Sequence, residues 1–160
     1  MRLEFWYEFA STYSYLSAMR IEAAAAEKGV EVSWKPFLLG PIFHSQGWDN
    51  SPFNIYPAKG AYMWRDMERQ CEKYGLPFAR PQIFPVHSVT VARLALIGST
   101  EGWCPEFSRR LFHAQFAETR DISDEAVLGD VLTGLGLDAT RYLQKTTTPD
   151  IKEALKKQTE

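Results

Sequence analysis

The most constraining feature of the sequence is its beginning, where two segments of alternating polarity flank one helical segment. Residues 2–9 and 30–36 each place apolar side chains at every second position, which is the period of a β-strand. Between them, residues 12–28 repeat apolar side chains at steps of three and four, which predicts a helix that ends near Gly29. Two strands joined by a helix of this length are normally parallel, with a right-handed crossover. We therefore expect a β-α-β unit at the N-terminus.

The remainder of the chain predicts helices and no further strand. Residues 37–59 are rich in proline, glycine and aromatic residues, which indicates a long but ordered loop. A two-stranded sheet is marginal by itself, so we expect either that helices cover it or that further strands belong beside it. Ser123 is the expected N-cap of one helix. The expected helices are 60–74, 88–98, 105–117, 123–135, 138–145 and 149–160.

Composition and charge exclude several classes of function. The chain has 160 residues, of which 45% are apolar, so one domain with a sizeable core can form. The formal net charge of −2 argues against nucleic acid as a partner. No segment approaches the run of ~18 apolar residues that a membrane span needs. The three histidines and two cysteines show no metal-ligand spacing, so we expect no metal site.

Cysteine usage and the first residues bear on the compartment. Cys71 and Cys104 are far apart in the sequence and lie in helix-like contexts, which favours two buried thiols over a disulfide. The first nine residues alternate in polarity and do not form a signal-peptide core. We therefore expect a cytoplasmic protein.

Two serines three residues apart, Ser11 and Ser14, lie where the first strand passes into the helix. Ser11 is an ordinary N-cap on local grounds, worth ~1 kcal/mol. The same position also suits a hydroxyl that donates to a ligand's thiolate, because a helix start favours anions. A serine hydrolase would require a histidine base, for which only His44 and His87 remain open, and neither lies in a recognisable motif.

Three segments in order resemble the 2-hydroxychromene-2-carboxylate isomerase family, a relative of the kappa-class glutathione transferases and of the disulfide oxidoreductase DsbA. The resemblance covers Leu3 to Glu160 and rests on the segments FASTYSYL, PFLLGPIF and WDNSPFNIYPAKGAYM. It implies an α/β, thioredoxin-like fold whose β-α-β start is followed by an inserted helical domain. Two further strands and a last helix complete the fold in that family, and we expect this C-terminal ββα part to be absent from this chain.

The resemblance also implies domain boundaries. Residues 1–40 would form the N-terminal β-α-β part of the thioredoxin-like domain, and residues 41–59 the active-site loop. Residues 60–146 would form the helical insertion. Residues 147–160 would return to the thioredoxin-like domain.

The resemblance further implies a function and a set of site residues. Ser11 matches the catalytic serine whose hydroxyl stabilises the glutathione thiolate, while Lys59 and Asn54, with Asn50 as the alternative, match residues that contact glutathione. The implied activity is glutathione-dependent cis–trans isomerisation of a small unsaturated aromatic acid. A kappa-type glutathione transferase and a non-catalytic DsbA-like binding module are the alternatives. The expected partner is a small molecule, and the resemblance is compatible with a homodimer.

Overall fold

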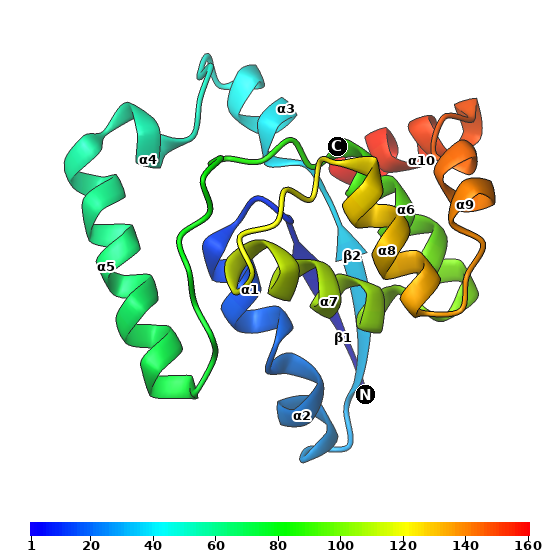
Figure 1. The fold of residues 1–160 in the computed structure, drawn as a ribbon, viewed down its shortest axis with the longest axis horizontal. Helices are drawn as coiled ribbons and strands as arrows, with labels where there is room; N and C mark the ends of the chain where they lie inside the picture. Colours follow the sequence, from blue (N-terminus) through cyan, green and yellow to red (C-terminus); the bar gives the residue numbers. More distant parts are fainter.

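The computed structural model describes all residues from Met1 to Glu160, and its centre is a parallel pair of strands (Figure 1). Strand β1 spans Arg2–Tyr7 and strand β2 spans Glu31–Pro36, with Phe5 opposite Trp34 in the register. The expected order, β-α-β followed only by helices, is confirmed. The fold is therefore the expected α/β type, with a small parallel sheet and many helices.

The crossover between the strands is not the single helix expected over residues 12–28. It consists of α1, Thr12–Ala18, and α2, Ile21–Ala26. At the break, the N–H of Arg20 bonds to the carbonyl of Ser17, three residues back, and the guanidinium of Arg20 lies 3.4 Å from the ring centroid of Tyr74. This cation–π contact belongs to the tertiary structure, so helical periodicity in the crossover could not reveal the bend.

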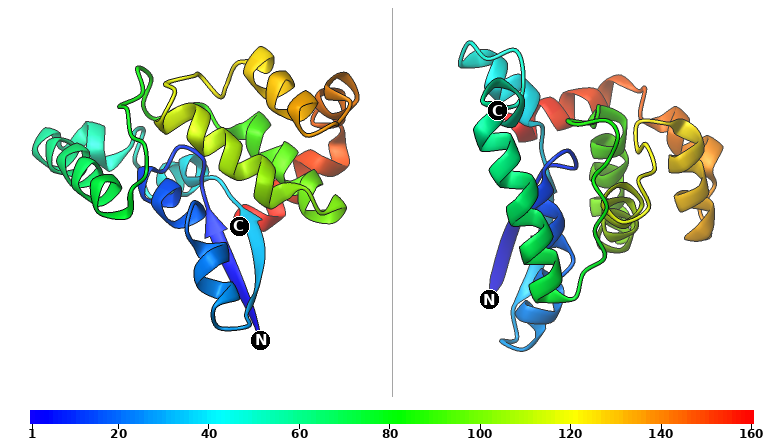
Figure 2. Two further views of the ribbon diagram at one scale, coloured as in Figure 1. Left: turned by 60° about the horizontal axis from the view of Figure 1, so that its bottom comes forward. Right: turned by 60° about the vertical axis from the view of Figure 1, so that its left-hand side comes forward.

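The helices after β2 form two lateral parts of the molecule. In Figures 1 and 2, α4 and α5 lie on one side, α6 and α8–α10 lie on the other, and the sheet, α1 and α7 lie between them. None of the helices combines the length and hydropathy needed to cross a membrane. Their bounds are α3 Leu39–Ser45, α4 Pro52–Ile55, α5 Pro57–Tyr74, α6 Val89–Glu101, α7 Cys104–Phe116, α8 Glu125–Gly134, α9 Ala139–Lys145 and α10 Pro149–Thr159.

Two expectations about local structure need correction. The segment 37–59 is not an irregular loop, because α3 and α4 lie within it and α5 already begins at Pro57. Neither α3 nor α4 has a buried residue, so no apolar stripe marked them in the sequence. The N-cap of α8 is Asp124 and not Ser123, since the Asp124 carboxylate accepts the Ala126 N–H at 2.9 Å.

The core extends from β1 across to α7. The ring of Phe9 stacks on Phe112 at 5.1 Å between centroids, and Tyr7 meets Trp34 edge to face at 5.2 Å. Both cysteines are free and buried, as expected, and the Tyr7 hydroxyl lies 3.3 Å from the sulfur of Cys104. Aromatic packing therefore joins the end of β1, where Ser11 follows, to the helical part of the fold.

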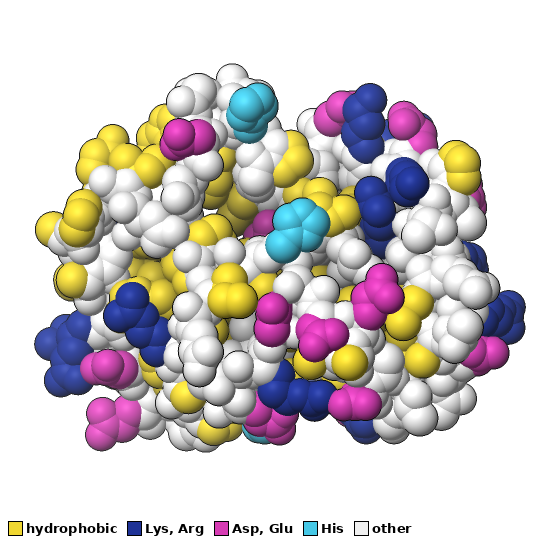
Figure 3. Space-filling view, turned by 45° about the horizontal axis from the view of Figure 1, so that its top comes forward, with side chains coloured by type: hydrophobic (Ala, Val, Ile, Leu, Met, Phe, Trp, Pro, Cys, Tyr) yellow, Lys and Arg dark blue, Asp and Glu magenta, His cyan; other side chains and the backbone are white.

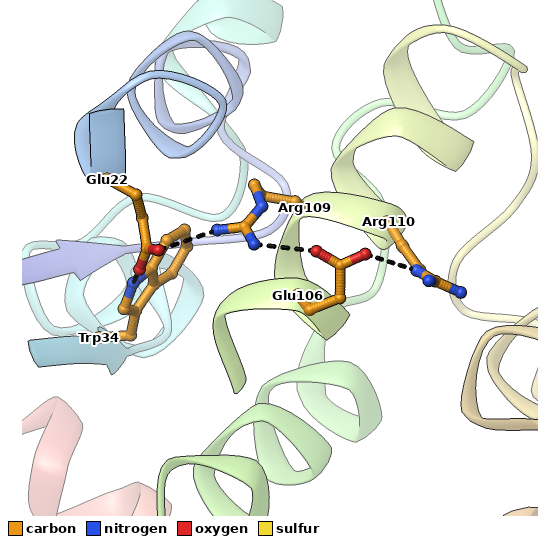
Figure 4. Close-up of polar contacts among 5 residues, drawn as sticks. All are labelled: Glu22, Trp34, Glu106, Arg109 and Arg110. Atoms are coloured by element: carbon orange, nitrogen blue, oxygen red, sulfur yellow. Dashed lines mark hydrogen bonds and ion pairs between the residues drawn. The ribbon is translucent and has the colours of Figure 1, made fainter. Parts of the chain in front are cut away.

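A polar network ties α2 and β2 to α7 on the outside of this core (Figure 4). Glu22 accepts the indole N–H of Trp34 at 2.8 Å and pairs with Arg109 at 3.4 Å. Arg109 and Arg110 each also pair with Glu106 at 2.8 Å, and these bonds hold the pKa of Glu106 below its usual value. All these charges have partners, so the network serves the packing of the crossover against α7.

Candidate functional site

A cavity of about 590 Å3 lies between the end of β1 and the α3–α4 segment. Figure 3 shows this hollow with apolar side chains inside and histidine side chains at its rim. Such a volume is within the range of roughly 300–1,000 Å3 typical of small-molecule sites. Lining residues come from the turn after β1, from the α3–α4 segment, from α5 and from the start of α6: Glu8, Ala10, Ser11, Leu38–Pro41, Phe43, His44, Trp48–Phe53, Lys59 and Phe84–Val89.

Ser11 lies on the cavity wall as the N-cap of α1. Its backbone is extended, with φ −86° and ψ 120°, and its hydroxyl oxygen accepts the Ser14 N–H at 3.2 Å. Because that bond uses only a lone pair of the oxygen, the hydroxyl proton is free to be donated to a ligand. Capping and ligand binding, the two interpretations of the sequence, are therefore compatible at Ser11.

Ser14 has a different place from Ser11 and does not line the cavity. Its hydroxyl oxygen accepts the backbone N–H of Glu8 at 3.3 Å, while the Ser11 N–H donates to the Glu8 carbonyl at 3.0 Å. The S-x-x-S pattern thus closes the turn between β1 and α1 and directs only its first hydroxyl toward the cavity.

Glu8 is a residue of the site that the sequence analysis did not single out. Only 3% of it is exposed, and its two carboxylate oxygens accept the N–H groups of Ala10 at 3.2 Å and Leu39 at 3.0 Å. Leu39 is the first residue of α3, which has no side-chain cap of its own. One buried carboxylate therefore joins the Ser11 turn to the α3 wall of the cavity. An acid three residues before Ser11 was the only local signal.

The two residues predicted to contact glutathione have different places in the structure. Lys59 lines the cavity from the first turn of α5, forms no ion pair, and holds its ammonium 5.9 Å from the ring centroid of Phe53. Asn54 does not line the cavity. Its amide donates to the Asn50 side chain and to the Phe84 carbonyl, both at 3.1 Å, and so joins two walls of the cavity. Asn50, the alternative position, does line the cavity.

The titratable and nucleophilic groups around the cavity favour some chemistries over others. His44 and His87 both line it, but neither is hydrogen-bonded to Ser11, so the nucleophile–base pair of a serine hydrolase is not formed. No cysteine lines the cavity, and burial raises the pKa of the Cys71 thiol to about 11 and also raises that of Cys104. The cavity therefore offers no thiol for dithiol–disulfide exchange, because a reactive cysteine needs an accessible thiolate.

Comparison with known proteins identifies relatives along nearly the full chain. An uncharacterised protein of Bacillus subtilis, YwbO, is 27% identical over 98% of this chain and 78% of its own length. The 2-hydroxychromene-2-carboxylate isomerase of Sphingobium xenophagum is 24% identical over 92% of this chain and 74% of its own length.

Solved structures with the same fold agree. A 2-hydroxychromene-2-carboxylate isomerase superposes with a TM-score of 0.88 at 21% identity, covering 99% of this chain and 77% of the other. The cytosolic disulfide reductase DsbM from Pseudomonas aeruginosa, with GSH, superposes with a TM-score of 0.69 at 14% identity over 99% of this chain and 77% of its own. The family model of the DSBA-like thioredoxin domain matches residues 2–160. The chain is therefore a member of the DSBA-like thioredoxin domain family.

Proposed function

We propose that the chain is a glutathione-dependent isomerase of small unsaturated aromatic acids, in which the Ser11 hydroxyl stabilises the glutathione thiolate. The observation that carries the proposal is the geometry of Ser11, whose oxygen accepts the Ser14 N–H and whose proton remains available to the cavity. A relative that is 24% identical over 92% of this chain and 74% of its own length is named 2-hydroxychromene-2-carboxylate isomerase.

The cavity fits glutathione in size and in the chemistry of its lining. Lys59 is a cation on the wall with no ion pair, which suits a carboxylate of the peptide, and Ser11 supplies a donor for sulfur. A DsbM structure of the same fold is described as containing GSH, which supports this ligand class. We therefore assign Ser11 and Lys59 as contacts of glutathione, and Asn54 as the residue that holds Asn50 and the Phe84 loop in place around it.

Glutathione supplies a nucleophilic sulfur that adds to an activated double bond and later leaves, so that the bond is single while it rotates. The task of Ser11 is to donate a hydrogen bond to the sulfur when it is ionised, which lowers the pKa of the thiol. Because α1 has only seven residues, the hydroxyl is the larger contribution and the helix dipole the smaller one. Aromatic side chains of the wall, Phe43, Trp48, Phe53 and Phe84, exclude water and pack against the acid.

The experiment is a calorimetric titration of glutathione into the wild type, Ser11→Ala and Lys59→Ala. The matched controls are Ser17→Ala, an exposed serine on the same helix, and Lys73→Ala, a lysine at the other end of α5. A hydrogen bond to a charged group is worth about 1.5 kcal/mol or more, so Ser11→Ala is expected to raise the pKa of the bound thiol by about one unit. The ultraviolet absorbance of the thiolate measures that pKa directly.

Several outcomes would contradict this proposal. If Ser11→Ala bound glutathione with an unchanged thiol pKa, the hydroxyl would be a cap and nothing more. If glutathione did not bind to the wild type, the binding-module alternative would replace the enzyme. Product analysis separates the two enzymatic alternatives, because an isomerase returns free glutathione whereas a transferase releases a thioether conjugate.

A further inference from the structure

The N-terminus of α6 opens into the same cavity from the wall formed by Phe84–Val89. Helix α6 has thirteen residues, Val89–Glu101, and both Ser88, its N-cap, and Val89 line the cavity. The first hydrogen bond of the helix is donated by the Ala92 N–H to the Ser88 carbonyl at 2.9 Å. The N–H groups of Val89, Thr90 and Val91 have no acceptor in the protein. Three donors of the first turn are therefore unpaired at this end of α6.

Ser88 provides a second and independent observation. Its side chain is 7% exposed and lines the cavity, yet its hydroxyl makes no hydrogen bond within the protein. The backbone of Ser88, with φ −102° and ψ 5°, is not in the extended conformation that lets an N-cap side chain bond to its own helix. By contrast, Ser11 and Ser51 are extended and cap α1 and α4. The Ser88 oxygen is not one of the fully buried polar atoms that lack a partner, so the hydroxyl is reachable from the cavity and can donate to a ligand there.

The polar groups at the N-terminus of α6 favour an anionic ligand. Free N–H groups and the positive end of the helix dipole favour negative charge, and a hydroxyl adds one more donor. The first turn of α6 contains no acidic side chain, and His87 lies next to Ser88 on the lining. Glu8 also lines the cavity, but both its oxygens already accept backbone N–H groups. The remaining lining is rich in aromatic side chains, so the anion that fits is attached to an apolar, aromatic group.

We propose that the N-terminus of α6 and the Ser88 hydroxyl form a carboxylate-binding subsite of the cavity, which holds the carboxylate of an aromatic acid. This inference extends the proposed function: the subsite is a substrate site only if the protein is the proposed isomerase. Binding of the acid at this subsite, however, requires neither Ser11 nor glutathione. Glutathione also carries carboxylates, and the experiment distinguishes binding of the aromatic acid from binding of glutathione at this subsite.

The test is a calorimetric titration of trans-cinnamate, and of the neutral cinnamamide, into the protein without glutathione. Cinnamate is expected to bind more tightly than the amide to the wild type, and Ser88→Ala to weaken cinnamate about tenfold while leaving the amide unchanged. Ser88→Ala is expected to keep its thermal midpoint, since the hydroxyl caps nothing. The matched control is Ser99→Ala on the far part of α6, where the hydroxyl bonds to the Ala95 carbonyl at 2.9 Å.

A second variant, Ser88→Asp, places a negative charge at the subsite and is expected to abolish cinnamate binding. The proposal is overturned if cinnamate does not bind to the wild type, if acid and amide bind equally, or if Ser88→Ala binds the acid like the wild type. It is also overturned if Ser88→Ala weakens glutathione and leaves cinnamate unchanged, because the subsite would then hold the peptide. Ser11→Ala is expected to keep its affinity for cinnamate, so this proposal and that of the isomerase can fail independently.

Discussion

The substitution Gly60→Ala tests how closely α4 packs against α5 in the cavity wall. Gly60 lies in the first part of α5, directly after Lys59, where α4 crosses close to α5. A Cβ at this position would lie 2.2 Å from the carbonyl oxygen of Phe53. That oxygen belongs to the backbone of α4 and cannot swing away as a flexible side chain could. To reach an ordinary contact, α4 must move by about 1 Å relative to α5.

The magnitude follows from two opposing effects. Alanine in place of glycine favours a helix by about 1 kcal/mol, while overpacking of a close contact costs about 1–3 kcal/mol. Because the 2.2 Å contact is with backbone, its cost lies at the upper end of that range, about 2–3 kcal/mol. We therefore expect Gly60→Ala to lower the free energy of unfolding by about 1–2 kcal/mol, or the thermal midpoint by about 2–8 °C for a domain of this size. Phe53 and Lys59 both line the cavity, so ligand affinity is expected to fall as well.

Gly129→Ala is the matched control for this experiment. Gly129 lies within α8, and its added Cβ would meet the Cβ of Ala139 at 3.9 Å, which is an ordinary contact. The same substitution should there raise the free energy of unfolding by up to about 1 kcal/mol. Thermal unfolding followed by circular dichroism measures both variants. If Gly60→Ala were as stable as the wild type, the close approach of α4 to α5 would be refuted.

Two further predictions concern buried or paired carboxylates. Glu8→Ala leaves the N–H groups of Ala10 and Leu39 without an acceptor and is expected to lower the free energy of unfolding by about 3 kcal/mol, whereas Glu8→Gln keeps one acceptor and loses less; chemical denaturation compares them. Hydrogen bonds from Tyr142, then Trp103, lower the pKa of Glu101 from 4.5 to about 2. Because the folded-state pKa is the lower one, the stabilisation is full above pH 4.5 and is lost as the pH falls toward 2. Glu101→Gln should therefore be less stable than the wild type at pH 7, and the difference should shrink as the pH falls from 4.5 toward 2. Urea unfolding at several pH values measures this difference. A difference that stays constant with pH would contradict the pairing of Glu101 with Tyr142 and Trp103.

Patterns within a few residues determined much of the fold. Alternation at the start of the chain predicted β1 and β2, and the helix expected over 60–74 is α5, which buries Met63, Met67 and Cys71. The helix expected over 138–145 is α9, whose N-cap is Asp138. Neighbouring residues are enough to predict strands, helices and caps, because these features depend on backbone geometry that repeats every few positions.

The sequence by itself determined that Ser11 stands at a helix start and that Lys59 follows the proline-rich segment, and the family resemblance joined them. Only the tertiary structure decided which groups share the cavity. Neighbouring residues could not reveal the role of Glu8, because its second oxygen bonds to Leu39, 31 positions away. They could not reveal the free hydroxyl of Ser88 either, because whether a serine caps its helix depends on a backbone conformation that the surrounding packing imposes. Sites of this kind form where segments that are distant in the sequence meet, and a local sequence pattern cannot predict such contacts.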